Sequence, residues 1–212
     1  MTMLAPPPSL ADQQHIVLED VPWEFYEQLL EVIGDRPIRI TYDEGNLEMM
    51  APLGPHERWK SQIGRMIELM CYERDINIAP YGSTTFRLKR RRKGLEPDEC
   101  YYVQHADEVA RIRDLNLKRN PPPDLAIEID ITSRSVEREP VYAGLGIPEL
   151  WRFDGRRLSI LKLMPSRKYR PIKNSIAFPF LKMPEFERYL LQIEQDVTSK
   201  SLQQFVDWVK SL

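Results

Sequence analysis

The eight residues that follow the triple proline at positions 121–123 constrain the fold more than any other part of this chain. From Asp124 to Ile131 polar or small residues alternate strictly with large aliphatic residues, so that every odd position is Leu or Ile. Strict alternation is typical of a β-strand, because successive side chains of a strand point to opposite faces. The prolines and the aliphatic face favour a buried central strand. An exposed edge strand is the alternative interpretation.

Three carboxylates lie on the polar face of this strand, at Asp124, Glu128 and Asp130. Residues two positions apart on a strand are separated by roughly 7 Å. Acidic side chains in a row with no cation between them repel one another. A divalent cation with oxygen ligands, Mg²⁺ or Mn²⁺, would relieve this repulsion. The pattern therefore predicts a carboxylate metal site, unless the face is simply exposed to solvent.

The segments before this strand predict two helices and a hairpin. Residues 22–33 carry apolar side chains at helical spacing, and Pro22 suits the first turn of a helix. We expect an apolar stripe at Phe25, Leu29, Leu30 and Ile33. Residues 38–42 and 47–50 flank a Gly-Asn turn, which predicts a β-hairpin. Residues 54–74 form a longer helical pattern, and its buried stripe comprises Trp59, Ile63, Met66, Ile67 and Met70.

The remaining patterns interleave strands and helices. We expect strands at 84–88, 96–103, 149–153 and 158–163, and helices at 105–113, 135–145 (capped by Gly146), 184–194 and 199–211. Such interleaving indicates an α/β fold with a central mixed β-sheet flanked by helices and an N-terminal β-hairpin. Without a repeat or a linker, we expect one domain over residues 16–212, preceded by a flexible arm at 1–15.

Composition narrows the class of protein. A chain with 42% hydrophobic and 29% charged residues is typical of a globular domain. No apolar run approaches the roughly 20 residues that cross a bilayer, and the N-terminus lacks the basic flank of a secretory signal. The two cysteines have no CxxC spacing, which indicates a reducing compartment. We expect a cytoplasmic protein without membrane association or an organic cofactor.

Local charge differs from the formal net charge of −2. Five consecutive cations form a basic run, which comprises Lys89, Arg90, Arg91, Arg92 and Lys93. Such a run can bind nucleic-acid phosphates. The same composition is also typical of a solvated loop. The basic run is therefore a candidate DNA-binding element and no more than that.

A second source of carboxylates precedes the apolar residues Tyr101-Tyr102-Val103. Asp98 follows Pro97 and lies in an acidic stretch, Glu96-Pro97-Asp98-Glu99. Pro-Asp is common in turns, so the dipeptide by itself does not distinguish a turn from a site.

Taken together, the two acidic segments resemble the PD-(D/E)xK signature of metal-dependent nucleases: Pro97-Asp98, a gap, and Glu128-Ile129-Asp130. The resemblance extends to the Uma-two family of restriction-endonuclease-like proteins, which are abundant in cyanobacteria. It is carried by Pro123–Ile129, Asp130–Ser135 and Tyr142–Asp154, and also by Gly45-x-Leu47-x-x-Met50-x-Pro52 and Gly54-x-His56. The similar region spans roughly residues 22–212.

This resemblance implies a restriction-endonuclease-like fold in which Asp98 and Glu128 bind a magnesium-type ion and assist cleavage of DNA phosphodiester bonds. The lysine expected at the third position of the strand motif is replaced by Asp130. Arg138 stands where relatives carry a lysine, so the cation of the site is expected there. Arginine can offset phosphate charge, but its pKa is too high for it to serve readily as a base. The alternative for Arg138 is a residue on the helix surface.

The helix at 54–74 supplies two further candidates. Glu57 is a candidate metal ligand, because the first long helix of such nuclease folds often supplies an acid. It is also an acid favoured in a first helical turn by the helix dipole. His56 projects close to the apolar stripe and suits either the site or a hydrogen-bonded place in the core.

Three function classes follow. The first is a Mg²⁺- or Mn²⁺-dependent endonuclease acting on DNA, which we favour. The second is a nuclease fold that has lost its chemistry and binds DNA or protein. The third, a glycosidase with Glu128 and Asp98 as its acid and base, does not account for the pattern at 123–154. We also expect a homodimer, because a two-fold axis suits cleavage of both strands of a symmetric duplex.

Overall fold

A computed structural model describes residues 15–51, 54–131, 136–196 and 199–212. One of its two β-sheets is antiparallel throughout and contains the N-terminal hairpin. Its order is β1 (His15–Leu18), β3 (Asn46–Met50), β2 (Arg39–Asp43), β6 (Lys93–Leu95) and β5 (Phe86–Leu88). The predicted hairpin is present, but its turn is Glu44-Gly45 (φ 52° and 116°) and not Gly-Asn, because Asn46 already pairs with Asp43 in the ladder. His15, the end of the expected arm, begins β1; residues 1–14 lie outside the described ranges.

The second sheet is mixed, as predicted. Its order is β11 (Tyr169–Pro171), β10 (Leu158–Leu163), β9 (Glu149–Phe153), β8 (Leu125–Ile129), β7 (Glu99–Tyr102) and β4 (Ala79–Pro80). β8 and β9 are parallel, and the other neighbours are antiparallel. β8 therefore lies inside the sheet, which excludes the edge-strand alternative.

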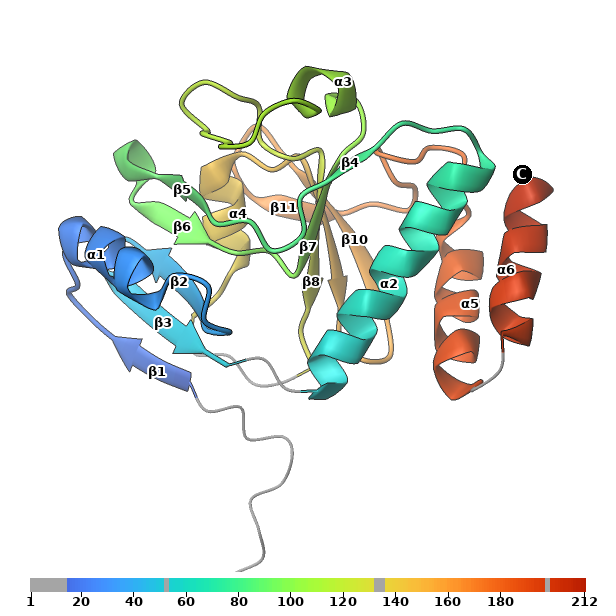
Figure 1. Ribbon diagram of the computed structural model, residues 1–212, viewed down its shortest axis with the longest axis horizontal. Helices are drawn as coiled ribbons and strands as arrows, with labels where there is room; N and C mark the ends of the chain where they lie inside the picture. Colours follow the sequence, from blue (N-terminus) through green and yellow to red (C-terminus); the bar gives the residue numbers. More distant parts are fainter. Residues whose placement is uncertain (1–14, 52–53, 132–135, 197–198) are drawn as a thin grey trace, which may run out of the picture.

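Helices cover both faces of the mixed sheet (Figure 1). The helices are α1 (Trp23–Ile33), α2 (Gly54–Glu73), α3 (Ala106–Val109), α4 (Glu139–Leu145), α5 (Met183–Gln195) and α6 (Lys200–Lys210), with a 3-10 turn at Lys89–Arg91. α2 packs on β8 and also contacts α5 and α6, whereas α4 contacts β2, β5 and β6 of the antiparallel sheet. In the described part of the chain, no helix combines the length and apolar character needed to span a membrane.

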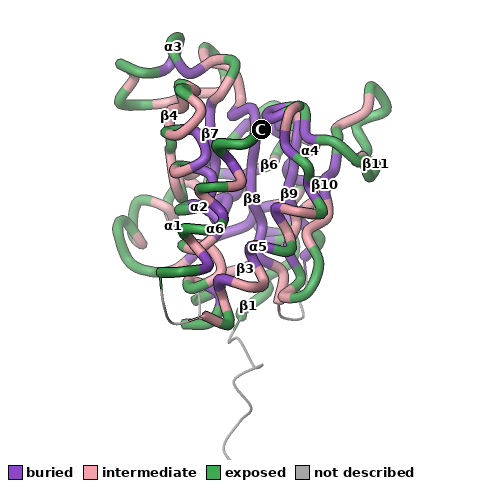
Figure 2. The backbone as a smooth tube through the Cα atoms, turned by 90° about the vertical axis from the view of Figure 1, so that its right-hand side faces the viewer, coloured by how far each residue is buried: buried purple, intermediate pink, exposed green. Residues whose placement is uncertain are grey.

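The five residues of β8 are buried on both faces, and Figure 2 shows the central strands β8 and β9 enclosed. Leu125, Ile127 and Ile129 belong to the core cluster formed with α2, α5 and α6. Ala126 belongs instead to the cluster with Tyr142 of α4. Because side chains alternate along a strand, Glu128 shares the α4 face with Ala126.

The predicted apolar stripe of α1 was wrong in one respect. Phe25 is 44% exposed, whereas Trp23 and Tyr26 are buried. The helix is rotated because the rings of Trp23 and Tyr26 pack with each other and with Tyr42 of β2. The ring centroids are 5.0 Å apart for Trp23–Tyr26, 5.3 Å for Trp23–Tyr42 and 4.9 Å for Tyr26–Tyr42. Tyr26 also lies against Gly94, where an added Cβ would come within 2.2 Å of the tyrosine hydroxyl oxygen. Aromatic packing therefore sets the buried face of α1.

The helix predicted at 135–145 begins later, at Glu139. Pro140 occupies its first turn, where proline requires no amide donor, and residues 132–135 lie outside the described ranges. The predicted cap is confirmed, since Gly146 has a left-handed conformation with φ 88°. The helices α5 and α6 and the β9–β10 hairpin also match the expected elements.

Candidate active site

The polar face of the β2–β3 hairpin supplies the first cation of the site. Arg39 and Thr41 lie on this face, and the strand register pairs Thr41 with Glu48. The alternate residue Ile40 belongs to the cluster that packs on α1. Because the two faces of a strand alternate, this packing turns Arg39 away from α1. The Arg39 residue is only 7% exposed.

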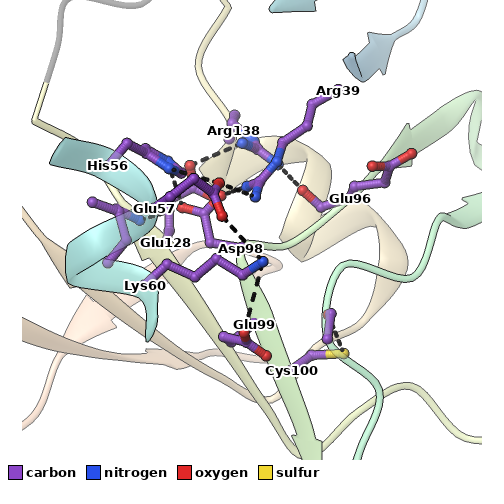
Figure 3. A network of polar contacts seen from close by, with 12 residues as sticks. Arg39, His56, Glu57, Lys60, Glu96, Asp98, Glu99, Cys100, Glu128 and Arg138 are labelled. Atoms are coloured by element: carbon purple, nitrogen blue, oxygen red, sulfur yellow. Dashed lines mark hydrogen bonds and ion pairs between the residues drawn. The ribbon is translucent and has the colours of Figure 1, made fainter. Parts of the chain in front are cut away.

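Asp98 and Glu128 lie next to each other on neighbouring chain segments. Glu99 pairs with Ile127 in the antiparallel β7–β8 ladder, so one further step of the register sets Asp98 opposite Glu128. The Asp98 amide donates to the Ile127 carbonyl oxygen (3.1 Å), and the Ile129 amide donates to Asp98 Oδ2 (2.6 Å). Both acidic residues are buried, at 0% and 3% exposure. Figure 3 shows their side chains in one polar cluster.

Arg39 and His56 hold the Asp98 carboxylate. Arg39 Nη1 forms a close ion pair with Asp98 Oδ1, and His56 Nε2 lies 3.1 Å from Asp98 Oδ2. Burial lowers the pKa of Arg39 from its usual value, and the nearby Glu57 carboxylate opposes that shift. His56 comes from the first turn of α2, so three separate parts of the fold meet at Asp98.

Arg138 and Tyr142 hold Glu128 from α4. Arg138 Nη1 donates to Glu128 Oε1 (2.9 Å), and the Tyr142 hydroxyl donates to Glu128 Oε2. The two residues are four positions apart, so they share one face of the helical turn. Arg138 also donates to the Glu96 carbonyl oxygen. Burial works to lower the pKa of Arg138, but Glu128 and further acidic neighbours raise it overall.

Each of the two central acids is paired with one arginine, and the buried Glu48 adds a further carboxylate near Arg138. Asp98 and Glu128 contribute two negative charges, and Arg39 and Arg138 contribute two positive ones. Buried ion pairs of this kind cost desolvation free energy, which their mutual attraction offsets only when both partners are present. The site therefore depends on both carboxylates having cationic partners.

Three charged side chains, those of Glu57, Lys60 and Glu99, border the centre on the α2 side and are called the rim. Glu57 Oε1 accepts from Arg39 Nη2 (3.0 Å), and the Glu57 side chain is 42% exposed. Lys60 Nζ lies 3.5 Å from Glu57 Oε2 and 3.8 Å from Glu99 Oε1. Burial raises the pKa of Glu99, and Lys60 opposes that shift. The rim thus connects the buried centre to solvent through charged side chains (Figure 3).

Comparison with known families identifies the chain. A model of the Uma2 family, described as "Putative restriction endonuclease", matches residues 23–198. This chain belongs to the Uma2 family. A crystal structure from Anabaena variabilis ATCC 29413, described as a putative nuclease belonging to DUF820, has 14% sequence identity and a TM-score of 0.45; the match covers 85% of this chain and 97% of that one. A comparison with curated protein sequences gave no match.

Among the residues predicted for this Uma2 site, Asp124 lies apart from the centre. Asp124 Oδ2 accepts from the amides of Val103 (2.8 Å) and His105 (3.0 Å), and Oδ1 lies 2.6 Å from His105 Nδ1. It therefore fixes the loop after β7. The expected repulsion along the strand is relieved differently for each acid, since Asp124 faces His105 and Glu128 faces Arg138.

Asp130 continues the pairing of β8 beyond its last strand residue. Its amide donates to the carbonyl oxygen of Phe153 (2.7 Å), and the residue is half-buried. It directly precedes Ile131 and the residues 132–135 that the structure does not describe.

The basic run follows β5 of the antiparallel sheet and ends at Lys93, the first residue of β6, and its ion pairs are local. Lys89 Nζ lies 3.0 Å from Glu24 Oε1 of α1, and Lys93 Nζ contacts Asp43 at the hairpin. Arg92 Nη2 donates to the Tyr42 hydroxyl (3.1 Å). Arg90 and Arg91 are exposed. Across the described ranges, no ion pair joins the basic run to Asp98 or Glu128.

Two residues of this cluster had no place in the sequence prediction. Arg39 carried a signal, because it is a lone charge between Ile38 and Ile40 in a strand pattern. Tyr142 also carried one, since it follows Arg138 at the four-residue spacing of a helix face.

The donor chemistry of the centre suits a hard divalent cation. Mg²⁺ is commonly held by one or two carboxylates, with water and substrate phosphates completing its ligands. Asp98 and Glu128 provide two carboxylates, and their guanidinium partners mark positions that require positive charge. In the part of the chain that the structure describes, no group of three or more His, Cys, Asp or Glu side chains forms a larger ligand set. The fit is therefore to a two-carboxylate site.

Proposed function

We propose that this Uma2-family chain is a divalent-metal-dependent endonuclease that hydrolyses DNA phosphodiester bonds. The family description supports a nuclease. The observation that carries the proposal is the meeting of Asp98 and Glu128 from neighbouring strand segments in one buried cluster with two arginines.

In this proposal Asp98 and Glu128 hold Mg²⁺ or Mn²⁺. The bound ion would lower the pKa of a water ligand and offset charge on the scissile phosphate. The Ile129 amide and His56 orient the Asp98 carboxylate, and Tyr142 orients that of Glu128. These contacts pre-arrange the ligands, so that little ordering is needed when the ion binds.

Arg138 provides fixed positive charge beside Glu128. Its raised pKa keeps it charged at neutral pH, so it offsets phosphate charge and does not accept the proton of the attacking water. Lys60 places a second cation at the exposed rim, next to Glu57. Its ammonium would offset the charge of a phosphate at the rim, where the Glu57 side chain (42% exposed) is more accessible than that of Lys60 (17%).

DNA is the proposed partner, and the basic run is its proposed electrostatic contact. Arg90 and Arg91 are exposed and carry the side chains best placed for phosphates outside the site. We also propose a homodimer, since a two-fold axis presents one site to each strand of a symmetric duplex. Sedimentation that finds only a 25.0 kDa species would overturn the dimer.

Plasmid nicking tests the proposed activity. Wild-type protein should nick supercoiled DNA with Mg²⁺ or Mn²⁺ and not with chelator, and both Asp98→Asn and Glu128→Gln should abolish nicking. Arg188→Gln removes a half-exposed ion pair with Glu185 on α5, away from the centre, and is the matched control. Nicking that survives both acidic substitutions would refute the proposal.

A binding module without turnover is the second candidate function. The observation that favours it is the arginine pairing of both carboxylates, together with Asp130 at the position of the strand lysine. Salt-dependent DNA affinity with no cleavage under any divalent cation would support this module over the endonuclease.

A further inference from the structure

Arg39 links the two sheets at the proposed metal site. It comes from β2 of the antiparallel sheet, and its guanidinium reaches Asp98, the residue that directly precedes β7 of the mixed sheet. One terminal nitrogen contacts Asp98 Oδ1, and the other lies 3.0 Å from Glu57 Oε1. The two carboxylates differ in their surroundings, because the side chain of Asp98 is 0% exposed and that of Glu57 is 42% exposed.

The Arg39 guanidinium and a metal ion would compete for the same oxygen. With Arg39 on Asp98 and Arg138 on Glu128, each of the two carboxylates already has its own counter-charge. A divalent cation added there would lie close to two fixed positive charges in a poorly solvated place, where repulsion is strong. Metal binding at Asp98 therefore favours withdrawal of Arg39.

Glu57 offers Arg39 a second partner on the solvent side. Arg39 Nη2 is already bonded to Glu57, so the guanidinium keeps one ion pair when it leaves Asp98. Lys60 lies beside the same carboxylate, so a DNA phosphate drawn to this rim would also attract Arg39 outward.

We propose that Arg39 is the resident counter-ion of Asp98, and that a DNA phosphate at the Glu57 rim withdraws it and so opens Asp98 to the divalent cation. This inference rests on the proposed endonuclease function and adds a regulation to it. Metal and DNA then bind cooperatively, and by thermodynamic reciprocity each raises the affinity for the other.

Manganese binding with and without DNA tests the inference directly. Free Mn²⁺ is measured by its paramagnetic resonance signal in titrations of the full chain, alone and with a phosphorothioate duplex that resists cleavage. The variants are Arg39→Gln, Arg39→Lys and Asp98→Asn, with Arg188→Gln on α5 as the control for loss of an arginine elsewhere. Arg39→Lys retains the positive charge and replaces Arg39→Gln if that variant fails to fold. A single ammonium cannot bridge Asp98 and Glu57 as the two terminal nitrogens of Arg39 do.

For wild type and Arg188→Gln, the duplex should tighten Mn²⁺ binding about tenfold or more, within the usual range of coupling between sites. Arg39→Gln should bind Mn²⁺ about as tightly without DNA as wild type does with it, and Arg39→Lys should lie between them. Equal Mn²⁺ affinity in wild type and both Arg39 variants, with binding lost in Asp98→Asn, would overturn the counter-ion role alone. Unchanged Mn²⁺ binding in Asp98→Asn would overturn the proposed metal site as well.

Discussion

The buried centre around Asp98 and Glu128 and the basic run at 89–93 use the same chemistry in opposite surroundings. In both places cationic side chains lie within about 3 Å of carboxylates: Arg138 and Glu128 are 2.9 Å apart, Lys89 and Glu24 3.0 Å. The side chains of the first pair are each 4% exposed, whereas those of the second are 54% and 66% exposed. Exposure, and not distance, separates them.

The difference determines what each region can do. A buried pair that loses one partner leaves an uncompensated charge in the core, which is strongly destabilising. An exposed pair loses little, because water and salt replace the partner. The buried Arg138–Glu128 pair therefore holds its charges in fixed positions, as the proposed catalytic site requires, whereas the basic run could exchange its partners for phosphates of the proposed DNA partner.

The largest expected effect follows from removing one partner of a buried pair. Glu128→Ala removes the carboxylate that is paired with the buried Arg138 and should lower the free energy of unfolding by about 3–5 kcal/mol. Urea denaturation measures the change. Arg152→Ala, which removes the half-exposed pair with Glu139, should cost at most about 1 kcal/mol. Equal losses in the two variants would remove the contrast between buried and exposed pairs.

A smaller effect is expected at Asp124, which holds a loop and not an arginine. Asp124→Ala deprives the Val103 and His105 amides and the His105 ring of their acceptor. The expected loss is about 1–3 kcal/mol of unfolding free energy. Asp107→Ala on the exposed side of α3 is the control and should change it by less than about 0.5 kcal/mol. A loss at Asp124 as small as that of the control would show that the loop needs no such anchor.

Cys71 is a buried neutral side chain, and its burial affects stability through the pKa of its thiol and not through an ion pair. Burial raises the pKa of its thiol from 9.0 to about 12. The unfolded chain ionises first, so the contribution to stability is complete below pH 9 and is lost as pH rises toward 12. Native protein should resist thiol reagents at mildly alkaline pH and react after unfolding in urea. Cys71→Ala should lose less stability than wild type over the same alkaline range; an identical decline would contradict the assignment.

The smallest effect on stability is expected in the basic run. Replacing Lys89, Arg90 and Arg91 with Gln should leave the unfolding curve unchanged, because these side chains lie in solvent. DNA binding should weaken, with a shallower dependence on salt, since fewer counter-ions are released. A DNA affinity and salt slope equal to those of wild type would remove the basic run from the proposed interface.

The sequence predicted those parts of the fold that depend on local pattern. The alternation at 124–131 identified β8, and the Gly-Asn signal identified the hairpin, although its turn lies one residue earlier, at Glu44-Gly45. It did not reveal β1, β4 or β11, because strands of two to four residues are too short for a clear period. Phe25 was assigned to the wrong side of α1, since the buried face is set by aromatic packing on Tyr42.

Only part of the candidate site could be predicted, because some of its contacts join segments that are distant in the sequence. Asp98 and Glu128 were predicted from the resemblance to a nuclease signature. Arg138 was predicted because it stands where relatives carry a lysine. Arg39 did not, because its contact with Asp98 depends on how the two sheets pack together. Asp124 could not be distinguished from Glu128 by alternation alone, since the partners that separate them, His105 and Arg138, lie on different segments.

The central claim is that Asp98 and Glu128 bind the same divalent cation. Crystals of the wild-type protein soaked in Mn²⁺ test it directly through the anomalous scattering of the metal. We predict one strong anomalous peak bound by both carboxylates, with the Arg39 guanidinium displaced toward Glu57. Soaked crystals with no anomalous peak between these two side chains, and with both arginines still paired to them, would contradict it.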